Sequence, residues 1–131
     1  TLQLLGVSTN GGSHLMVQLG DSGGVETTGY LGGAATSSSG VTSTASDSAG
    51  FILEAGGAFT AASIRYGHIV LTLSDASNTW SMSSVTALTA GNVVSQAAGG
   101  KQTSAALDRI SLTTVGGTEA FDSGSINILY E

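Results

Sequence analysis

Short apolar runs separated by turn-forming residues are the feature that most constrains the fold of this chain. The runs alternate apolar with polar residues, or are rich in β-branched residues, as is typical of strands. Gly, Ser, Asn and Asp favour turns, and they fill the segments between the runs, such as STNGGS at 8–13 and SDASNT at 74–79. The predicted strands are 2–7, 14–19, 50–54, 66–74, 79–85, 107–115 and 125–130, with less regular candidates at 25–31 and 92–97.

The pattern gives little support to helices. The best helical window, 103–109, is short and follows a pair of glycines. Strands at this spacing, without long helices between them, predict an all-β fold, namely an antiparallel, jelly-roll-like β-sandwich of about eight strands. The length of 131 residues fits one domain, so we expect residues 1–131 to form a single β-sandwich.

One low-complexity segment, GAATSSSGVTSTASDSA at 33–49, has side chains too small to build a core. It fits either a long surface loop or a strand of small side chains. Long loops in compact domains are often mobile or functional. We expect the mobile surface loop.

The end of the chain predicts a strand pair. The last run places Ile126, Ile128 and Tyr130 on one face, and the run at 109–113 alternates in the same way. We therefore expect these two runs to form a hairpin that closes the sandwich. The loop between them contains Phe121, which we expect to fold back onto the core.

Scarce cations and missing cysteines exclude several function classes. The chain has nine acidic residues, three cationic residues and a formal net charge of −6. Nucleic-acid binding requires a basic stripe, and no apolar run approaches the roughly 20 residues that span a bilayer. We therefore expect no nucleic-acid partner and no membrane insertion. Without cysteine, disulfides and thiolate chemistry are excluded.

Aromatic residues are candidates for ligand binding, because aromatic rings stack on the apolar faces of sugars. Trp80 lies at the start of a predicted strand, directly after a turn. A core position is the structural alternative for its ring. Tyr30 and Trp80 are the aromatic residues that we assign to a candidate ligand-binding surface.

Two nearby acids are further candidates. Glu119 and Asp122 lie three residues apart in a loop. Glycosidases use two carboxyl groups about 5–10 Å apart, but any two acids in one loop satisfy this spacing. An Asx-turn cap for Asp122 and a solvated Glu119 are the structural alternatives. We retain both as ligand-binding candidates and predict no catalytic residue.

The remaining titratable residues predict no site. Asp108 and Arg109 are neighbours on a strand and point to opposite faces, so we expect no direct ion pair between them. His14 and His68 are isolated from one another in the sequence and lack the spacing of paired metal ligands. We therefore expect neither a metal nor another cofactor.

Three segments together resemble a C-terminal domain found on virion proteins of tailed bacteriophages. In order, they are GVSTNGGSHLMVQLGDSGGVETTGYLGG, HIVLTLSDASNTWSMSSV and LDRISLTTVGGTEAFDSGSINILYE. The closing segment is the most specific, because the family ends on a similar LDR, TTV-G-T, F-D and YE pattern. The resemblance implies that Glu131 is the natural terminus. It also implies that further residues precede Thr1, where TLQLLGV already reads as a strand.

The resemblance implies a location in the virion and a role without catalysis. We expect the distal head of a tail fibre or tail tip, which associates with itself as a homotrimer and with other virion proteins, and which binds a host surface receptor such as a glycan. One alternative is a capsid decoration or cement protein. A less favoured alternative is a glycan-cleaving tailspike-type enzyme that uses Asp108, Glu119 or Asp122.

Overall fold

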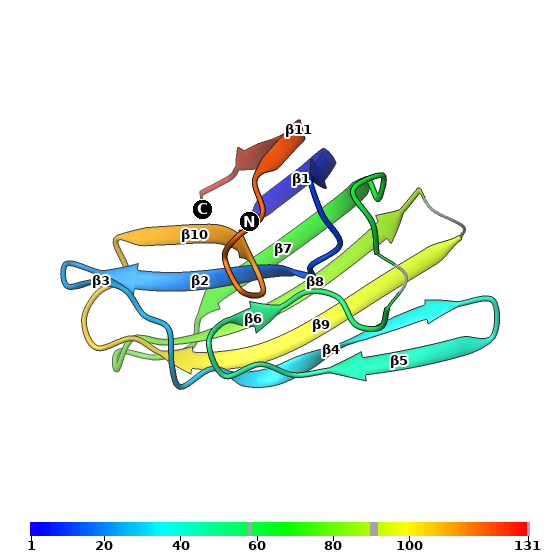
Figure 1. Cartoon of the computed structure of the whole chain (residues 1–131). Helices are drawn as coiled ribbons and strands as arrows, with labels where there is room; N and C mark the ends of the chain where they lie inside the picture. Colours follow the sequence, from blue (N-terminus) through cyan, green and yellow to red (C-terminus); the bar gives the residue numbers. More distant parts are fainter. Residues whose placement is uncertain (58, 90–91, 131) are drawn as a thin grey trace.

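The structure is an antiparallel β-sandwich of two unequal sheets (Figure 1). It is a computed structural model that describes residues 1–57, 59–89 and 92–130. The larger, seven-stranded sheet has the order β11 (Phe121–Ile128), β1 (Leu2–Thr9), β7 (Arg65–Leu73), β8 (Thr79–Leu88), β9 (Val93–Gln102), β4 (Leu31–Ser38), β5 (Val41–Ala45). The smaller sheet contains β10 (Arg109–Thr114), β2 (Leu15–Asp21), β3 (Gly24–Val25) and β6 (Phe51–Ile52).

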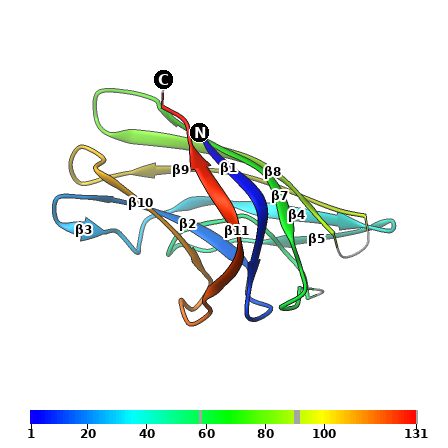
Figure 2. The same ribbon diagram turned by 90° about the horizontal axis from the view of Figure 1, so that it is seen from above.

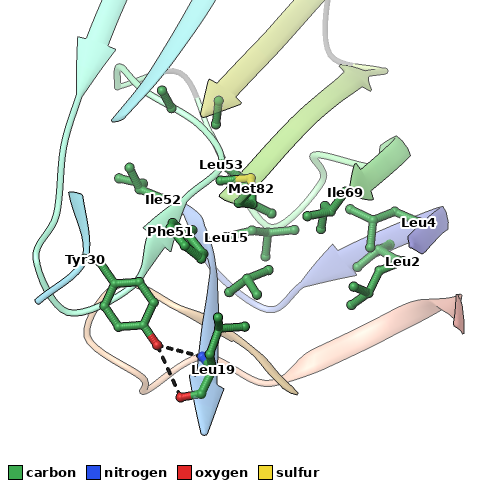
Figure 3. Close-up of a cluster of buried hydrophobic side chains, with 14 residues drawn as sticks. Leu2, Leu4, Leu15, Leu19, Tyr30, Phe51, Ile52, Leu53, Ile69 and Met82 are labelled. Carbon is green, nitrogen blue, oxygen red and sulfur yellow. Dashed lines mark hydrogen bonds between the residues drawn. The ribbon is translucent and has the colours of Figure 1, made fainter. Parts of the chain in front are cut away.

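The core lies between the two sheets and follows the period-2 alternation of the strands (Figure 3). Alternate residues of β1 and β7 point inward, so that Leu2, Leu4 and Ile69 are buried. They pack with Leu15 and Leu19 of β2 from the other sheet. The predicted all-β sandwich is confirmed, and the described residues include no helix.

The segment 33–49 is largely a β-hairpin, so the expected surface loop is wrong. Strands β4 and β5 pair from Ala34 with Ala45 to Ser38 with Val41. Ser39 and Gly40 form the turn with φ of 47° and 83°, as a two-residue hairpin with positive φ at both positions requires. The inward-facing side chains of this hairpin, such as Thr36, are small.

The predicted hairpin between the last two long strands is also wrong. β10 pairs with β2 in the smaller sheet, whereas β11 pairs with β1 at the edge of the larger sheet. The chain crosses from one sheet to the other between them. Phe121 begins β11 and is 39% exposed, so it does not fold onto the core. The alternation of residues fixes which face they share, but it does not fix the partner strand.

The sandwich has two distinct ends. At one end, called here the terminal end, the amino group of Thr1 donates a hydrogen bond to the carbonyl of Leu129 at 2.8 Å. Figures 1 and 2 both place the two termini together there. The opposite end carries the β4–β5 turn and the start of β7. The described residues include no helix of the length and hydrophobicity that crossing a membrane requires.

Candidate functional site

A pocket with a cavity volume of about 270 Å³ opens at the opposite end of the sandwich. The β4–β5 hairpin forms one wall, and the segment that leads into β7 forms another. The last residue of β8, Leu88, and the first residue of β9, Val93, form the third. The pocket therefore lies where a strand pair, a loop and the edge of the larger sheet meet.

The apolar part of the pocket is a small satellite core of Phe59, Leu88 and Val93. The Phe59 ring is held from two sides. The His14 ring packs against it edge-on, with centroids 5.0 Å apart, and the Arg65 guanidinium carbon lies 5.6 Å from its centroid. Because both neighbours restrain the ring, Phe59, which is 9% exposed, forms a fixed part of the apolar wall.

Hydroxyl groups form the polar part of the pocket. Thr36 Oγ1 accepts a hydrogen bond from the Ala55 amide at 2.8 Å and lies 2.7 Å from Ser95 Oγ. Ser63 Oγ accepts a bond from the Thr60 amide at 3.0 Å. Ser38 and Ser43 complete the hydroxyl-bearing lining. The described lining residues carry no charge, so the pocket is neutral and combines an apolar wall with hydroxyl groups.

A buried ion pair fixes the loop behind the pocket. Arg65 donates to Glu54 through Nε at 2.6 Å and through Nη2 at 3.1 Å, and both side chains are 0% exposed. Arg65 Nη1 also donates to the Ser63 carbonyl at 3.0 Å. The Leu15 amide donates to Glu54 Oε2 at 3.3 Å. These bonds tie β7, the loop and β2 together, so the pocket wall is preorganised.

Tyr30 lies in the core near the terminal end and is only 3% exposed, so its ring offers no surface for stacking. Its hydroxyl accepts a hydrogen bond from the Leu19 amide at 2.6 Å (Figure 3). The hydroxyl also lies 3.0 Å from the Glu26 carbonyl. Burial raises the pKa of this hydroxyl. Lys101 Nζ lies 5.3 Å from the ring centroid. Tyr30 is thus a structural residue, contrary to its assignment to a binding surface.

Trp80 also lies at the terminal end, far along the strands from the pocket. It is partly buried, faces inward from the start of β8 and packs against the core. Its Nε1 is buried without a hydrogen-bond partner. The ring borders an open hollow beside Thr1 and Leu129, which places it next to the termini.

Glu119 and Asp122 lie at the same end as the pocket but outside its lining. Glu119 accepts hydrogen bonds from the Ser13 amide at 2.9 Å and from Thr9 Oγ1 at 3.1 Å. Asp122 accepts a bond from Ser8 Oγ at 2.5 Å. Asp122 therefore joins β11 to β1, and Glu119, in the loop just before β11, joins that loop to β1 and to the β1–β2 loop. Glu119 is partly buried and hydrogen-bonded, so it is not the freely solvated side chain of the structural alternative. The four predicted residues do not converge on one site.

Glu119 is expected to make the stability of the domain depend on pH. Hydrogen bonding from Ser13, the largest cause, lowers the pKa of Glu119 from its ordinary value of 4.5. A carboxylate whose pKa is lower in the folded state stabilises the protein above its unfolded pKa, and this contribution is lost as the pH falls through the folded pKa. The variant Glu119→Gln should have a lower Tm than the wild type at neutral pH.

The measurement is the Tm of both proteins between about pH 7 and pH 3. The wild type should lose more Tm on acidification than Glu119→Gln, so that the two curves converge at the acidic end. Parallel curves would contradict the role of the Glu119 carboxylate.

The expectation for Asp108 and Arg109 is wrong, because the two side chains bond directly. Arg109 donates through Nε to Asp108 Oδ1 at 2.6 Å and through Nη2 to Oδ2 at 3.1 Å. Both are exposed at the start of β10, where long side chains can curl around the strand edge. Among the described residues, no three His, Asp or Glu side chains are grouped as metal ligands.

Sequence reasoning missed the pocket residues. Thr36, Ser38 and Ser43 fall in the segment predicted as a loop, and Phe59 lies between predicted strands. Their only signal was that Phe59 is a large apolar residue within a Gly- and Ala-rich loop. No family model, curated protein or solved structure matches this chain. The resemblance to phage virion proteins therefore stays a prediction from the sequence motifs.

Proposed function

We propose that this domain is a non-enzymatic head domain of a bacteriophage tail appendage, and that its pocket binds a neutral sugar unit of a host surface glycan. The pocket carries the binding part of this proposal. It has a fixed apolar wall at Phe59 and the partly exposed hydroxyl groups of Ser38 and Ser43, behind which the hydroxyls of Thr36 and Ser63 are buried. Sugars have apolar ring faces and uncharged hydroxyls, so this lining matches their chemistry.

The size and position of the pocket support the same proposal. Its volume of about 270 Å³ is near the lower limit of roughly 300 Å³ for small-molecule sites, which favours one terminal sugar over a long chain. The pocket lies at the end opposite Thr1. In an appendage whose stalk precedes Thr1, this end would point away from the particle and toward the host.

The acids support a role without glycan cleavage. Asp108 lies at the start of β10 near the terminal end, whereas Glu119 lies at the opposite end. A glycosidase needs a general acid with a raised pKa, but hydrogen bonds lower the pKa of both Asp108 and Glu119. Neither lies in the lining of the pocket. Asp108 and Glu119 are thus separated from one another, and the pKa of each is shifted away from that of a general acid.

One observation favours the capsid decoration alternative. Val85 and Val94 on the outward face of the larger sheet are 45% and 43% exposed, and a cement protein needs such surfaces to contact capsid subunits. Electron cryomicroscopy of the particle separates the two locations. Density for this chain at the tip of a tail appendage would support the head domain, and density on the capsid lattice would overturn it.

Filling the pocket tests the binding function. Ser43 lines the pocket, so Ser43→Trp should place an indole in the cavity and weaken sugar binding at least about tenfold, a loss of about 1.4 kcal/mol in binding free energy. The measurement is saturation-transfer NMR against neutral monosaccharides, with glucose, galactose and N-acetylglucosamine as first probes.

The matched control is Ser22→Trp, in the exposed β2–β3 turn at the terminal end. It should bind the same sugar as the wild type. The proposal fails if none of a complete panel of neutral monosaccharides binds the wild type at millimolar concentration. It also fails if Ser43→Trp folds and binds as well as Ser22→Trp.

A further inference from the structure

The outer face of the larger sheet, which points away from the smaller sheet, carries no charged side chain among the described residues of its strands. Arg65 and Lys101 are buried on the inner side, and Asp122 bonds the buried Ser8. The chain has a net charge of −6, yet a surface that extends across the sheet is neutral. This surface is called the outer face below.

An apolar ridge crosses one half of the outer face. Leu5 of β1 pairs with Tyr66 of β7, and the row continues through Ala87 of β8 to Val94 of β9. Leu5 is 58% exposed and Tyr66 is 44% exposed. Contiguous exposed apolar side chains of this kind mark interaction surfaces.

A shallow hollow lies beside the ridge, over β8, β9, β4 and β5. It has a volume of about 570 Å³ and is lined by small side chains such as Ala35, Thr44, Ser83 and Ala98. The two large side chains of the ridge, Leu5 and Tyr66, are on β1 and β7, whereas the hollow is over β8, β9, β4 and β5. A rotation by 180° about an axis that lies in the plane between two facing sheets, midway between the two features, therefore brings the ridge of one copy over the hollow of another.

Electrostatics favours a second copy of this chain as the occupant. Two copies that each carry a net charge of −6 repel wherever their acids meet, and the outer face is free of acids. A basic partner would instead be attracted to acids that lie off this face, such as Asp75 in the β7–β8 loop. A neutral, self-complementary face is the arrangement that a twofold interface requires.

The area is sufficient for a stable pair. The outer face is counted over six strands of the larger sheet, from β1 to β5 in the sheet order, without the edge strand β11. At a strand spacing of about 4.8 Å and a length of about seven residues, each rising about 3.3 Å, these strands cover on the order of 650 Å² in projection. A standard interface buries about 800 Å² of accessible surface per partner, and the accessible surface of side chains exceeds their projection.

We propose that two copies of this chain pair through the outer face, with the Leu5–Tyr66 ridge of each copy seated in the hollow of the other. The contact is a face-to-face packing of two sheets, for which small residues such as Ser83 and Ala98 allow close approach. This pairing does not depend on the pocket, which opens on the inner side of the larger sheet. It replaces the homotrimer that the family resemblance implied with a twofold pair.

The test compares two valines of nearly equal exposure. Val85 is on the outer face and is 45% exposed, whereas Val25 is on the smaller sheet and is 42% exposed. Val85→Glu places an unpaired charge in the interface of each copy and should weaken pairing at least about 100-fold. Val25→Glu should leave pairing unchanged.

The measurement is solution mass by light scattering and sedimentation over a dilution series. The wild type and Val25→Glu should have twice the 12.9 kDa mass of the chain, and Val85→Glu should have the mass of one chain at the same concentration. A wild type that stays monomeric at about 100 μM, or has three times the chain mass, overturns the proposal. So does equal weakening by both variants.

A second variant keeps the test valid if Val85→Glu fails to fold. Gln96 is the cross-strand neighbour of Val85 and is exposed, so Gln96→Glu adds a charge with little change in shape. It should also weaken pairing, and the effect should shrink in high salt. Unchanged pairing in folded Gln96→Glu overturns the proposal.

Sugar binding by the monomeric variants separates the pairing from the pocket, because Gln96 and Val85 lie outside the pocket lining.

Discussion

Replacing Arg65 by alanine is expected to lower the free energy of unfolding by about 3–5 kcal/mol, because it leaves the Glu54 carboxylate buried without its partner. Glu54 and Arg65 are both 0% exposed, and the guanidinium donates two hydrogen bonds to the carboxylate. The same guanidinium bonds the Ser63 carbonyl, so the loop behind the pocket should loosen as well. The measurement is equilibrium unfolding in urea at fixed protein concentration.

Arg109→Ala is the matched control for this prediction. Arg109 also bonds a carboxylate through two nitrogens, but it is 46% exposed and its partner Asp108 is 44% exposed. An exposed pair contributes about 0–1 kcal/mol, so Arg109→Ala should change stability little. The double variant Glu54→Leu with Arg65→Met should recover much of the loss, since a buried apolar pair can replace a buried ion pair. If Arg65→Ala and Arg109→Ala lower the free energy of unfolding equally, the buried Glu54–Arg65 pair does not have the structural role given to it here.

The strands and the sandwich could be predicted because the larger sheet buries only one of its faces. Its residues then alternate between core and solvent, as in Met82, Ser83 and Ser84 of β8, where the serine between the two buried residues is exposed. The hairpin of β4 and β5 was not predicted because its inward residues are mainly Ala, Thr and Ser, which give little apolar signal. Its strongest clue was the Ser39–Gly40 turn.

The pairing of strands and the site could not be predicted, because both depend on contacts between residues distant in sequence. The partner of β11 is β1, more than a hundred residues away. The pocket likewise combines Thr36, Phe59 and Val93 from three separate segments. Tyr30 was assigned to the wrong role because the sequence does not show whether a tyrosine ring is exposed to a ligand or buried. In the structure its hydroxyl makes hydrogen bonds within the core.

Replacing Gly32 by alanine is expected to lower the free energy of unfolding by about 2–5 kcal/mol, from backbone strain and overpacking combined. Gly32 has a φ of 122°, which a residue with a side chain rarely adopts. A Cβ at this position would collide with the Ala98 carbonyl oxygen and lie 2.5 Å from Gly99 Cα on the neighbouring strand β9. These obstacles are backbone atoms that form the β4–β9 ladder, so they cannot rotate away as a side chain would.

Gly100→Ala is the control, because it makes the same change on the partner strand β9, where the nearest atom to an added Cβ is the Trp80 carbonyl oxygen at 3.9 Å. Gly100 pairs with Leu31, next to Gly32, so the two variants probe the same part of the sheet. Gly100→Ala should be neutral, or should stabilise by up to about 1 kcal/mol by restricting the unfolded chain. Two measurements check this prediction. Urea unfolding gives the free energy of unfolding of each variant, and amide hydrogen exchange of β4 should be faster in Gly32→Ala but not in Gly100→Ala. If Gly32→Ala is as stable as Gly100→Ala, the close approach of β4 to β9 at this glycine is wrong, and with it the register that brings Thr36 into the pocket.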